Sequence, residues 1–220
     1  MNTPTKITIS RIIAIGIMIV TLVVLYFVKI ANPDFYIPDI GNTKINWLYF
    51  GLFVFFVIAS FTDFLDGYLA RKNNQVTDFG KFLDPVADKL LVNSMVIFLI
   101  VPATYAPSQI STFSLWCAIL LVARDIVVDA LRFIAAQKGV VIAANIFGKA
   151  KTVLEMVAVS LVLLNGWPFI YFDADWGFFR ISNIFVYLCT AASLISGIIY
   201  LVKYGYVLKG EKQNDSTTSK

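Results

Sequence analysis

Aspartates, glycines and one arginine recur at a fixed spacing between residues 63 and 88. The pattern reads Asp63-x2-Asp66-Gly67-x2-Ala70-Arg71-x8-Gly80-x3-Asp84-x3-Asp88. Residues three or four apart share one face of a helix, so each pair of aspartates points in one direction. Converging carboxylates with no nitrogen or sulfur ligand suit a hard divalent cation such as Mg²⁺ or Mn²⁺. Four of them can bridge two such ions, which is a common arrangement for phosphate chemistry.

The remaining residues of this pattern suit a substrate that carries phosphate. Arg71 offers a planar fork of donors that matches phosphate oxygens. Gly67, Gly80 and Ala70 have little or no side chain, which allows something to approach the backbone closely. Pro85 has two interpretations. It either opens a helix at its first turn or lies inside the helix, where it leaves one carbonyl without its donor.

The rest of the chain is mostly apolar. Of 220 residues, 59% are hydrophobic and 15% are charged, whereas a soluble domain is typically about 45–50% apolar and about 25% charged. This composition indicates a protein that crosses a membrane several times. The sequence contains no histidine. Histidine-based catalysis and histidine metal sites are therefore excluded, and any general base is a carboxylate or a lysine.

Six apolar runs are long enough to cross a hydrocarbon layer of about 30 Å. They lie at 11–28, 47–70, 83–102, 113–135, 145–165 and 181–203. We therefore predict an all-α membrane bundle of six transmembrane helices in one domain, 1–208, followed by a disordered cytoplasmic tail, 209–220. The runs that carry the aspartates are joined by a short link, which predicts antiparallel neighbours. We find no functional pattern in the last run.

Lysine and arginine gather at alternate ends of these runs. One set of ends carries Lys6, Arg11, Arg71, Lys72, Lys81, Arg132, Lys138, Lys149 and Lys151, and the other carries Lys29, Lys44 and Arg180. By the positive-inside rule, both termini and the aspartates lie on the cytoplasmic side. Because the basic residues flank apolar runs, membrane lipid and topology explain the net charge of +4 better than nucleic acid does.

A structural role is the alternative for the aspartates. They could cap helices and pair with the cations nearest in sequence, which are Arg71, Lys72, Lys81 and Lys89. That interpretation suits one or two aspartates. Four at this spacing, with both glycines and the arginine, favour a functional site, because charge of this density beside a membrane is costly.

A second group of basic residues follows the aspartates. Arg124 and Arg132 share one helical stripe, and Lys149 and Lys151 lie at the start of the fifth run. Converging cations at a membrane face suit a second phosphate group, such as that of a phosphorylated acceptor.

Ion pairing is the alternative for this basic group. The two arginines could pair with Asp125 and Asp129 and so neutralise buried charge. Glu155 lies one helical turn after Lys151 and is its expected partner.

At every fixed position the aspartate pattern resembles the signature of the CDP-alcohol phosphotransferase family. The resemblance implies a six-helix bundle, a homodimer, and transfer of a substituted phosphoryl group from a CDP-linked donor to an alcohol. It implies two divalent cations, Mg²⁺ or Mn²⁺, held by Asp63, Asp66, Asp84 and Asp88, with Asp88 also acting as general base. It places Gly67, Ala70, Arg71 and Gly80 around the CDP moiety.

The acceptor is suggested by two further segments. The residues from Arg124 to Thr152 and the N-terminal Ile7-Thr8-x2-Arg11 are similar to members of the family that use sn-glycerol 3-phosphate. This similarity implies transfer of a phosphatidyl group from CDP-diacylglycerol to sn-glycerol 3-phosphate, at the cytoplasmic face of the cell membrane, in phospholipid synthesis.

Other functions are weighed against this one. Phosphatidylglycerol and inositol phosphate are alternative acceptors for the same chemistry. Aspartate-rich membrane prenyltransferases have their two motifs much farther apart. A cation transporter usually holds its ions near the membrane midplane between repeated halves, and we see no repeat here.

Overall fold

The computed structural model describes residues 3–72, 78–101, 106, 108–140, 142 and 146–206. Helices account for all the regular elements in these residues, as the sequence predicts. Six helices of the described part have 18 residues or more: α1 Thr3–Ala31, α2 Trp47–Lys72, α3 Asp78–Phe98, α4 Leu115–Gln137, α5 Ile146–Leu163 and α7 Ile181–Tyr204. The short helices α6, Ile170–Asp173, and η1, Ala174–Phe179, lie between α5 and α7. Each predicted apolar run therefore coincides with a long helix.

Two helical stretches in the described part are long and apolar enough to cross a membrane. They are Lys6–Ala31 and Asp175–Tyr204, and Trp47–Asp63 is a shorter apolar helix of the same kind. These stretches are consistent with a membrane protein. The number of six spans and the cytoplasmic position of the termini remain predictions.

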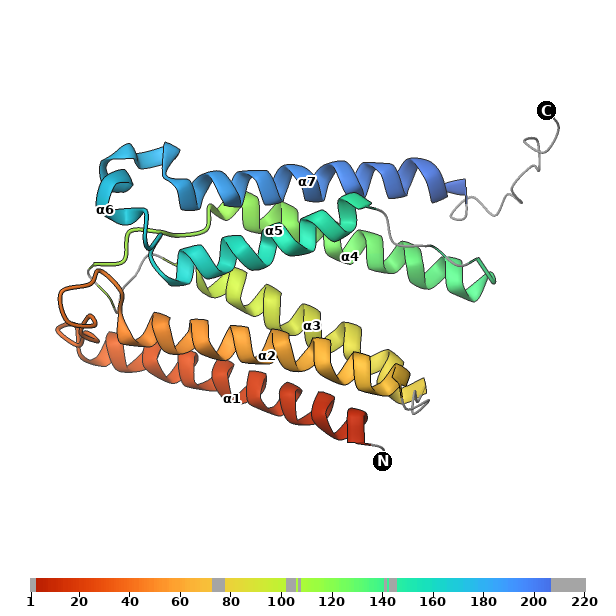
Figure 1. The fold of residues 1–220 in the computed structure, drawn as a ribbon, viewed down its shortest axis with the longest axis horizontal. Helices are drawn as coiled ribbons and strands as arrows, with labels where there is room; N and C mark the ends of the chain where they lie inside the picture. The colour runs from red at the N-terminus through yellow and green to blue at the C-terminus, as the bar shows by residue number, and fades with distance from the viewer. Residues whose placement is uncertain are drawn as a thin grey trace. The chain divides into compact units, whose positions relative to one another are not determined.

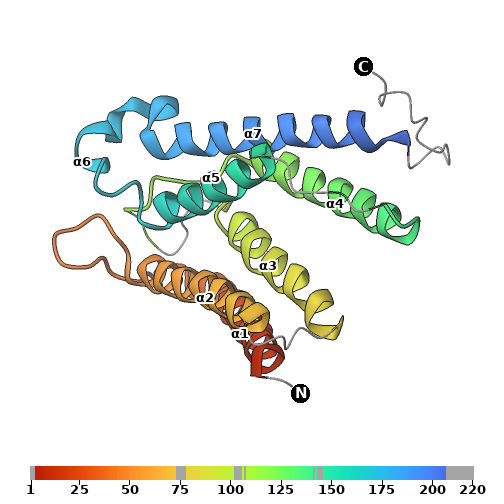
Figure 2. The ribbon, with the colours of Figure 1, turned by 45° about the vertical axis from the view of Figure 1, so that its right-hand side comes forward.

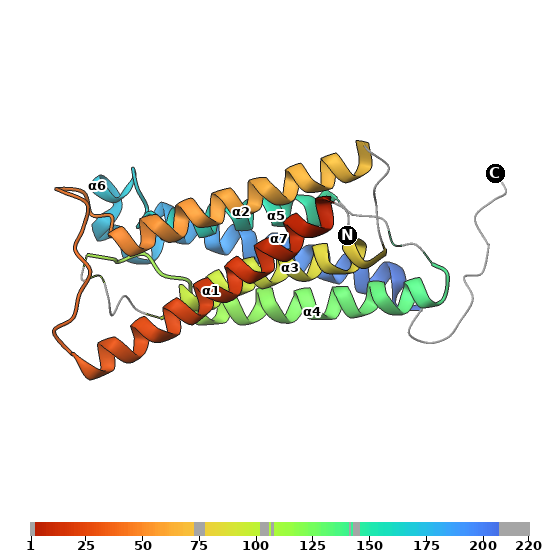
Figure 3. The same cartoon turned by 90° about the horizontal axis from the view of Figure 1, so that it is seen from below.

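The chain divides into two compact units. Unit 1 comprises Met1–Phe113 and Val159–Asn183, and unit 2 comprises Ser114–Ala158 and Ile184–Lys220. In unit 1, α1 packs against both α2 and α3, and α2 also contacts α3 (Figures 1 and 3). On α1 the buried side chains recur every three or four residues, at Ile15, Met18 and Leu22, because that spacing places them on one helical face.

The start of α1, the end of α2 and the start of α3 lie at the same end of unit 1 (Figure 1). The predicted antiparallel arrangement of α2 and α3 is confirmed. α3 begins at Asp78, earlier than the apolar run suggests, because its first turns are polar. Pro85 consequently lies inside the helix, and of its two interpretations the interior position is correct.

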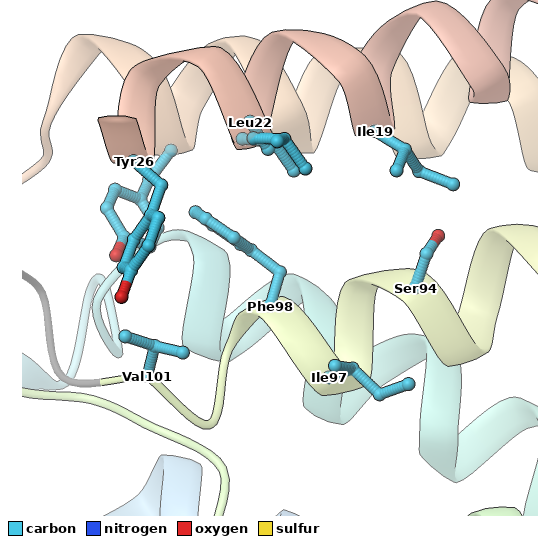
Figure 4. Close-up of a pocket in the computed structure, with 9 residues that line it drawn as sticks. Ile19, Leu22, Tyr26, Ser94, Ile97, Phe98 and Val101 are labelled. Carbon is cyan, nitrogen blue, oxygen red and sulfur yellow. The ribbon is translucent and has the colours of Figure 1, made fainter. Parts of the chain in front are cut away.

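An apolar cavity lies farther along α1 and α3. It has a volume of about 360 Å³, and its lining includes Ile19, Leu22, Tyr26, Ser94, Ile97, Phe98 and Val101 (Figure 4). Hydrocarbon surfaces of this kind suit an alkyl chain better than a phosphate or a nucleotide. The charged side chains of the aspartate pattern that the structure describes lie instead toward the end of unit 1 where α1 and α3 begin.

The loops at the opposite end of unit 1 are joined by one buried amide. Asn165 is 0% exposed, and its Oδ1 accepts hydrogen bonds from the backbone N–H groups of Ile110 at 2.8 Å and Ser111 at 3.0 Å. Its Nδ2 donates to the backbone carbonyls of Lys44 at 2.7 Å and Ser108 at 2.8 Å. A single side chain thus satisfies backbone groups of two loop segments and joins both to its own loop.

Replacing Asn165 with alanine is expected to lower the free energy of unfolding by about 2–3 kcal/mol. Buried backbone groups would lose their partners, and each such loss costs roughly 1–3 kcal/mol when water cannot replace it. Asn165 also has a positive φ of 55°, a conformation that asparagine tolerates better than alanine does. Thermal unfolding of the purified protein in detergent would measure the change. Asn183→Ala, which removes one exposed hydrogen bond to Gly177, is the control and should shift stability far less.

Unit 2 contains α4 and most of α5 and α7, and α4 lies beside α7 (Figure 2). Its core includes Val128 and Leu131 of α4 and Tyr200 of α7, with Ile142 and Tyr204 packed against them. Polar side chains of α4 and α7 also contact one another, and they include members of the predicted basic group.

Candidate active site

The aspartate pattern lies on two neighbouring helices at one end of unit 1. α2 carries Asp63, Asp66, Gly67, Ala70 and Arg71, and α3 carries Gly80, Asp84 and Asp88. The side chains of Asp63, Asp84 and Asp88 are half-buried. The side chains of Asp66, Ala70 and Arg71, and the surroundings of Gly67 and Gly80, fall outside what the structure describes.

The first helix brings two further side chains to these aspartates. Thr8 Oγ1 donates a hydrogen bond to Asp84 Oδ1 at 2.9 Å, and Arg11 Nη1 forms an ion pair with Asp63 Oδ1. Thr8 is 1% exposed and Arg11 is 5% exposed. The spacing of the aspartates could not reveal this contribution. The available signal is a threonine and an arginine three residues apart at the start of an apolar run.

Divalent cations are the cofactors that the family generally uses. Within the described residues no three His, Cys, Asp or Glu side chains gather into a metal-binding group, and Asp66 is not among the described side chains. The available donors nevertheless fit such an ion in kind, because they are carboxylates without competing nitrogen or sulfur ligands. Asp63 and Asp84 each contact α1 through the Oδ1 atom. The Oδ2 atom of each carboxylate does not take part in these two contacts.

The second basic group lies within unit 2. The guanidinium of Arg124 donates through Nη1 to Asp125 Oδ1 at 2.9 Å, through Nη2 to Ser196 Oγ at 2.7 Å, and through Nε to the carbonyl of Ser193 at 3.1 Å. Every nitrogen of this guanidinium therefore has an acceptor in α4 or α7. The pairing with Asp125 that the sequence left open is present.

Lys151 extends this arrangement into a buried network of four charges. Its Nζ lies 2.9 Å from Asp125 Oδ2 and forms an ion pair with Glu155 one helical turn away. The predicted partnership of Lys151 and Glu155 is confirmed. Lys151 is 2% exposed and Glu155 is 3% exposed. The charges of Arg124 and Lys151 balance those of Asp125 and Glu155, which is how ionic groups become tolerable inside a bundle.

Arg132 and Lys149 have different surroundings. Arg132 Nη2 donates to the Tyr200 hydroxyl at 2.8 Å, and its guanidinium carbon lies 5.0 Å from the centre of the Tyr200 ring. Its Nε is buried without an acceptor among the described residues. Lys149 is exposed in the first turn of α5, and Asp129 is exposed on α4.

The last helix supplies side chains that the sequence analysis does not identify. Ser193, Ser196 and Tyr200 of α7 contact Arg124 or Arg132. Gly197 lies in the same stretch, and a Cβ at this position would lie 2.9 Å from Arg124 Cγ, so that Arg124 would have to shift. The available signal is a set of hydroxyl-bearing residues three or four positions apart on an otherwise apolar helix, which places them on one helical face.

Apolar helices that carry carboxylates at one end and guanidinium groups in their interior are consistent with a membrane protein that handles phosphate compounds. The sequence matches the CDP-alcohol phosphatidyltransferase family over residues 1–200, and the chain belongs to that family. It is therefore a transferase.

Curated relatives cover most or nearly all of the chain. It is 36% identical to the CDP-diacylglycerol–glycerol-3-phosphate 3-phosphatidyltransferase of Bacillus subtilis (strain 168), over 94% of this chain and 97% of the relative. It is 35% identical to the protein of the same name from Rickettsia bellii (strain RML369-C), over 90% and 93%. The protein of that name from Mycoplasma pneumoniae is 36% identical over 73% of this chain and 70% of its own length.

Proposed function

We propose that the protein transfers the phosphatidyl group of CDP-diacylglycerol to sn-glycerol 3-phosphate, giving phosphatidylglycerophosphate and CMP. The observation that carries this proposal is the likeness to relatives named for that reaction, which extends over nearly the full length of both chains. The aspartates of α2 and α3 and the basic residues of α4 and α5 support it. The first group suits a diphosphate donor, and the second suits a phosphorylated acceptor.

In the proposed mechanism, Asp63, Asp66, Asp84 and Asp88 hold two divalent cations, Mg²⁺ or Mn²⁺, and Gly67, Ala70, Arg71 and Gly80 surround the CDP moiety. Bound cations would neutralise the charge of the diphosphate and favour ionisation of an alcohol. Asp88 lies one helical turn after Asp84 and takes the proton from the 1-hydroxyl of glycerol 3-phosphate. The alcohol oxygen then forms a bond to the phosphatidyl phosphorus, the phosphorus–oxygen bond to CMP breaks, and CMP leaves.

The acceptor phosphate is assigned to Arg124, Arg132, Lys149 and Lys151. Of these four basic residues, Arg132 and Lys149 do not belong to the four-charge network. Arg124 and Lys151 are paired within it, so their replacement should also reduce stability.

The reaction is placed at the cytoplasmic face of a multi-pass protein in the cell membrane, with six spans and both termini cytoplasmic. The protein is further proposed to act as a homodimer.

Replacing Tyr200 with phenylalanine is expected to raise the KM for glycerol 3-phosphate about threefold to tenfold. The ring would remain beside Arg132, but the guanidinium would lose the hydroxyl that orients it. The effect on the substrate is indirect and should therefore be smaller than the roughly 1.5–3 kcal/mol of a hydrogen bond to a charged group. Initial rates at varied glycerol 3-phosphate and saturating CDP-diacylglycerol would measure the change. Tyr171→Phe, at an exposed position of α6, is the matched control. An unchanged KM in Tyr200→Phe would contradict this orienting role.

The test of the function is release of CMP by the purified protein with CDP-diacylglycerol and Mg²⁺, with and without glycerol 3-phosphate. We expect release only when both substrates are present. Release with phosphatidylglycerol or inositol phosphate alone would keep the donor chemistry and overturn the acceptor. Absence of release with every alcohol would overturn the proposal and favour ion binding at the aspartates.

A further inference from the structure

We propose that Arg11, on α1, binds the diphosphate of the nucleoside diphosphate donor through the Nε–Nη2 edge of its guanidinium. This inference rests on the proposed function, because it takes the donor to be a CDP-linked lipid. Arg11 lies outside the aspartate pattern, so the assignment adds a residue from a third helix to the donor site.

The first argument is the position of Arg11. Its side chain is 4% exposed, and its Nη1 pairs with Asp63 on α2. One turn earlier on the same helix, Thr8 donates to Asp84 on α3. α1 is therefore held at the acidic end of unit 1 by two polar contacts, one to each neighbouring helix. Arg11 is fixed beside the carboxylates by these contacts.

The second argument is the part of the guanidinium that does not contact Asp63. Nε and Nη2 of Arg11 are buried and have no hydrogen-bond acceptor among the described residues. Buried donors are normally satisfied, and an unsatisfied group on a cation is especially costly. These two nitrogens form one edge of the planar group, and their N–H bonds run in parallel. Such an edge matches two oxygens of one phosphate or carboxylate.

The third argument identifies the anion. The described carboxylate that pairs with Arg11, Asp63, is already engaged through Nη1. Under the proposed function the anion that reaches this end of unit 1 is the donor's diphosphate, whereas the acceptor phosphate is assigned to α4 and α5. A phosphate with two oxygens toward Arg11 would satisfy both remaining donors at once. Asp63 would orient the guanidinium for that contact.

The test compares donor and acceptor in Arg11→Lys. Lysine keeps the charge and can still pair with Asp63, but it lacks the two parallel donors. We expect the affinity for CDP, measured by calorimetry with the detergent-purified protein and Mg²⁺, to fall about tenfold or more. The KM for CDP-diacylglycerol should rise similarly, and the KM for glycerol 3-phosphate should stay within about twofold. Arg11→Gln, which also removes the charge, should bind CDP no better than Arg11→Lys does.

The matched control is Arg180→Lys, the same change at a position where the guanidinium donates to the carbonyl of Ile110. It should leave CDP affinity unchanged. Unchanged CDP affinity in both Arg11 variants would overturn the inference and leave Arg11 as the counter-ion of Asp63. A rise confined to the KM for glycerol 3-phosphate would overturn it by placing Arg11 at the acceptor. Weakened CDP binding, in a protein whose wild type releases no CMP, would support the inference while the proposed function failed.

Discussion

Asp88→Asn is expected to lower the rate of CMP release at saturating substrates by about 10²–10⁴-fold, the usual contribution of a general base. Asparagine has nearly the same size as aspartate, but it can neither accept the proton of the glycerol hydroxyl nor supply negative charge to a cation. Asp88 is half-buried within α3, and the isosteric change should preserve the helix. CDP binding should consequently remain within a few fold of wild type, and the loss should appear in kcat.

Asp175→Asn is the matched control for this prediction. Asp175 is exposed in the first turn of η1, and the same exchange there should leave CMP release unchanged. Turnover retained in Asp88→Asn would remove Asp88 as the base. Loss of CDP binding together with turnover would instead show that Asp88 acts mainly in holding the donor.

Lys151→Met is expected to destabilise the protein by about 3–5 kcal/mol, the usual cost of leaving a buried charge without its partner. Lys151 is the cation that Asp125 and Glu155 share. Methionine fills a similar volume but would leave two buried carboxylates with Arg124 as their remaining cation in the network. The melting temperature in detergent should fall by roughly 6 °C or more for a chain of this size.

Two further variants separate the network from substrate binding. Lys149→Met is the same substitution at an exposed position of α5, and it should change stability by less than about 0.5 kcal/mol. Adding Glu155→Gln to Lys151→Met should recover part of the lost stability, because one uncompensated carboxylate is removed. Lys151→Met that melts like wild type but has a raised KM for glycerol 3-phosphate would show that Lys151 serves the substrate and not the fold.

The positions of the long helices could be predicted from the sequence because each is an apolar run of nearly the right length. The predicted ends of the helices were less accurate where a helix continues into polar residues. α3 starts at Asp78 and not near residue 83, so Pro85 is an interior residue. The antiparallel pairing of α2 and α3 followed from the short link between them, since so few residues allow no other return.

The candidate site was predictable only in part. The aspartates could be predicted as site residues because four carboxylates at helical spacing are rare and costly in an apolar chain. The pair Lys151 and Glu155 was also predictable, because residues four apart meet on any helix. The contacts of Thr8, Arg11, Ser196 and Tyr200 were not predicted, since the partner of each residue lies about 50 or more positions away.

The amino-acid sequence by itself determined the class of fold, the helix positions, the aspartate cluster and the kind of chemistry that it favours. These features depend on composition and on spacings within a single helix, which the order of residues sets directly. The tertiary structure alone decided which helix supplies Arg11 to Asp63 and which supplies Tyr200 to Arg132. Those contacts depend on how separate helices pack. No periodicity within one helix can encode which side chains of another will face it.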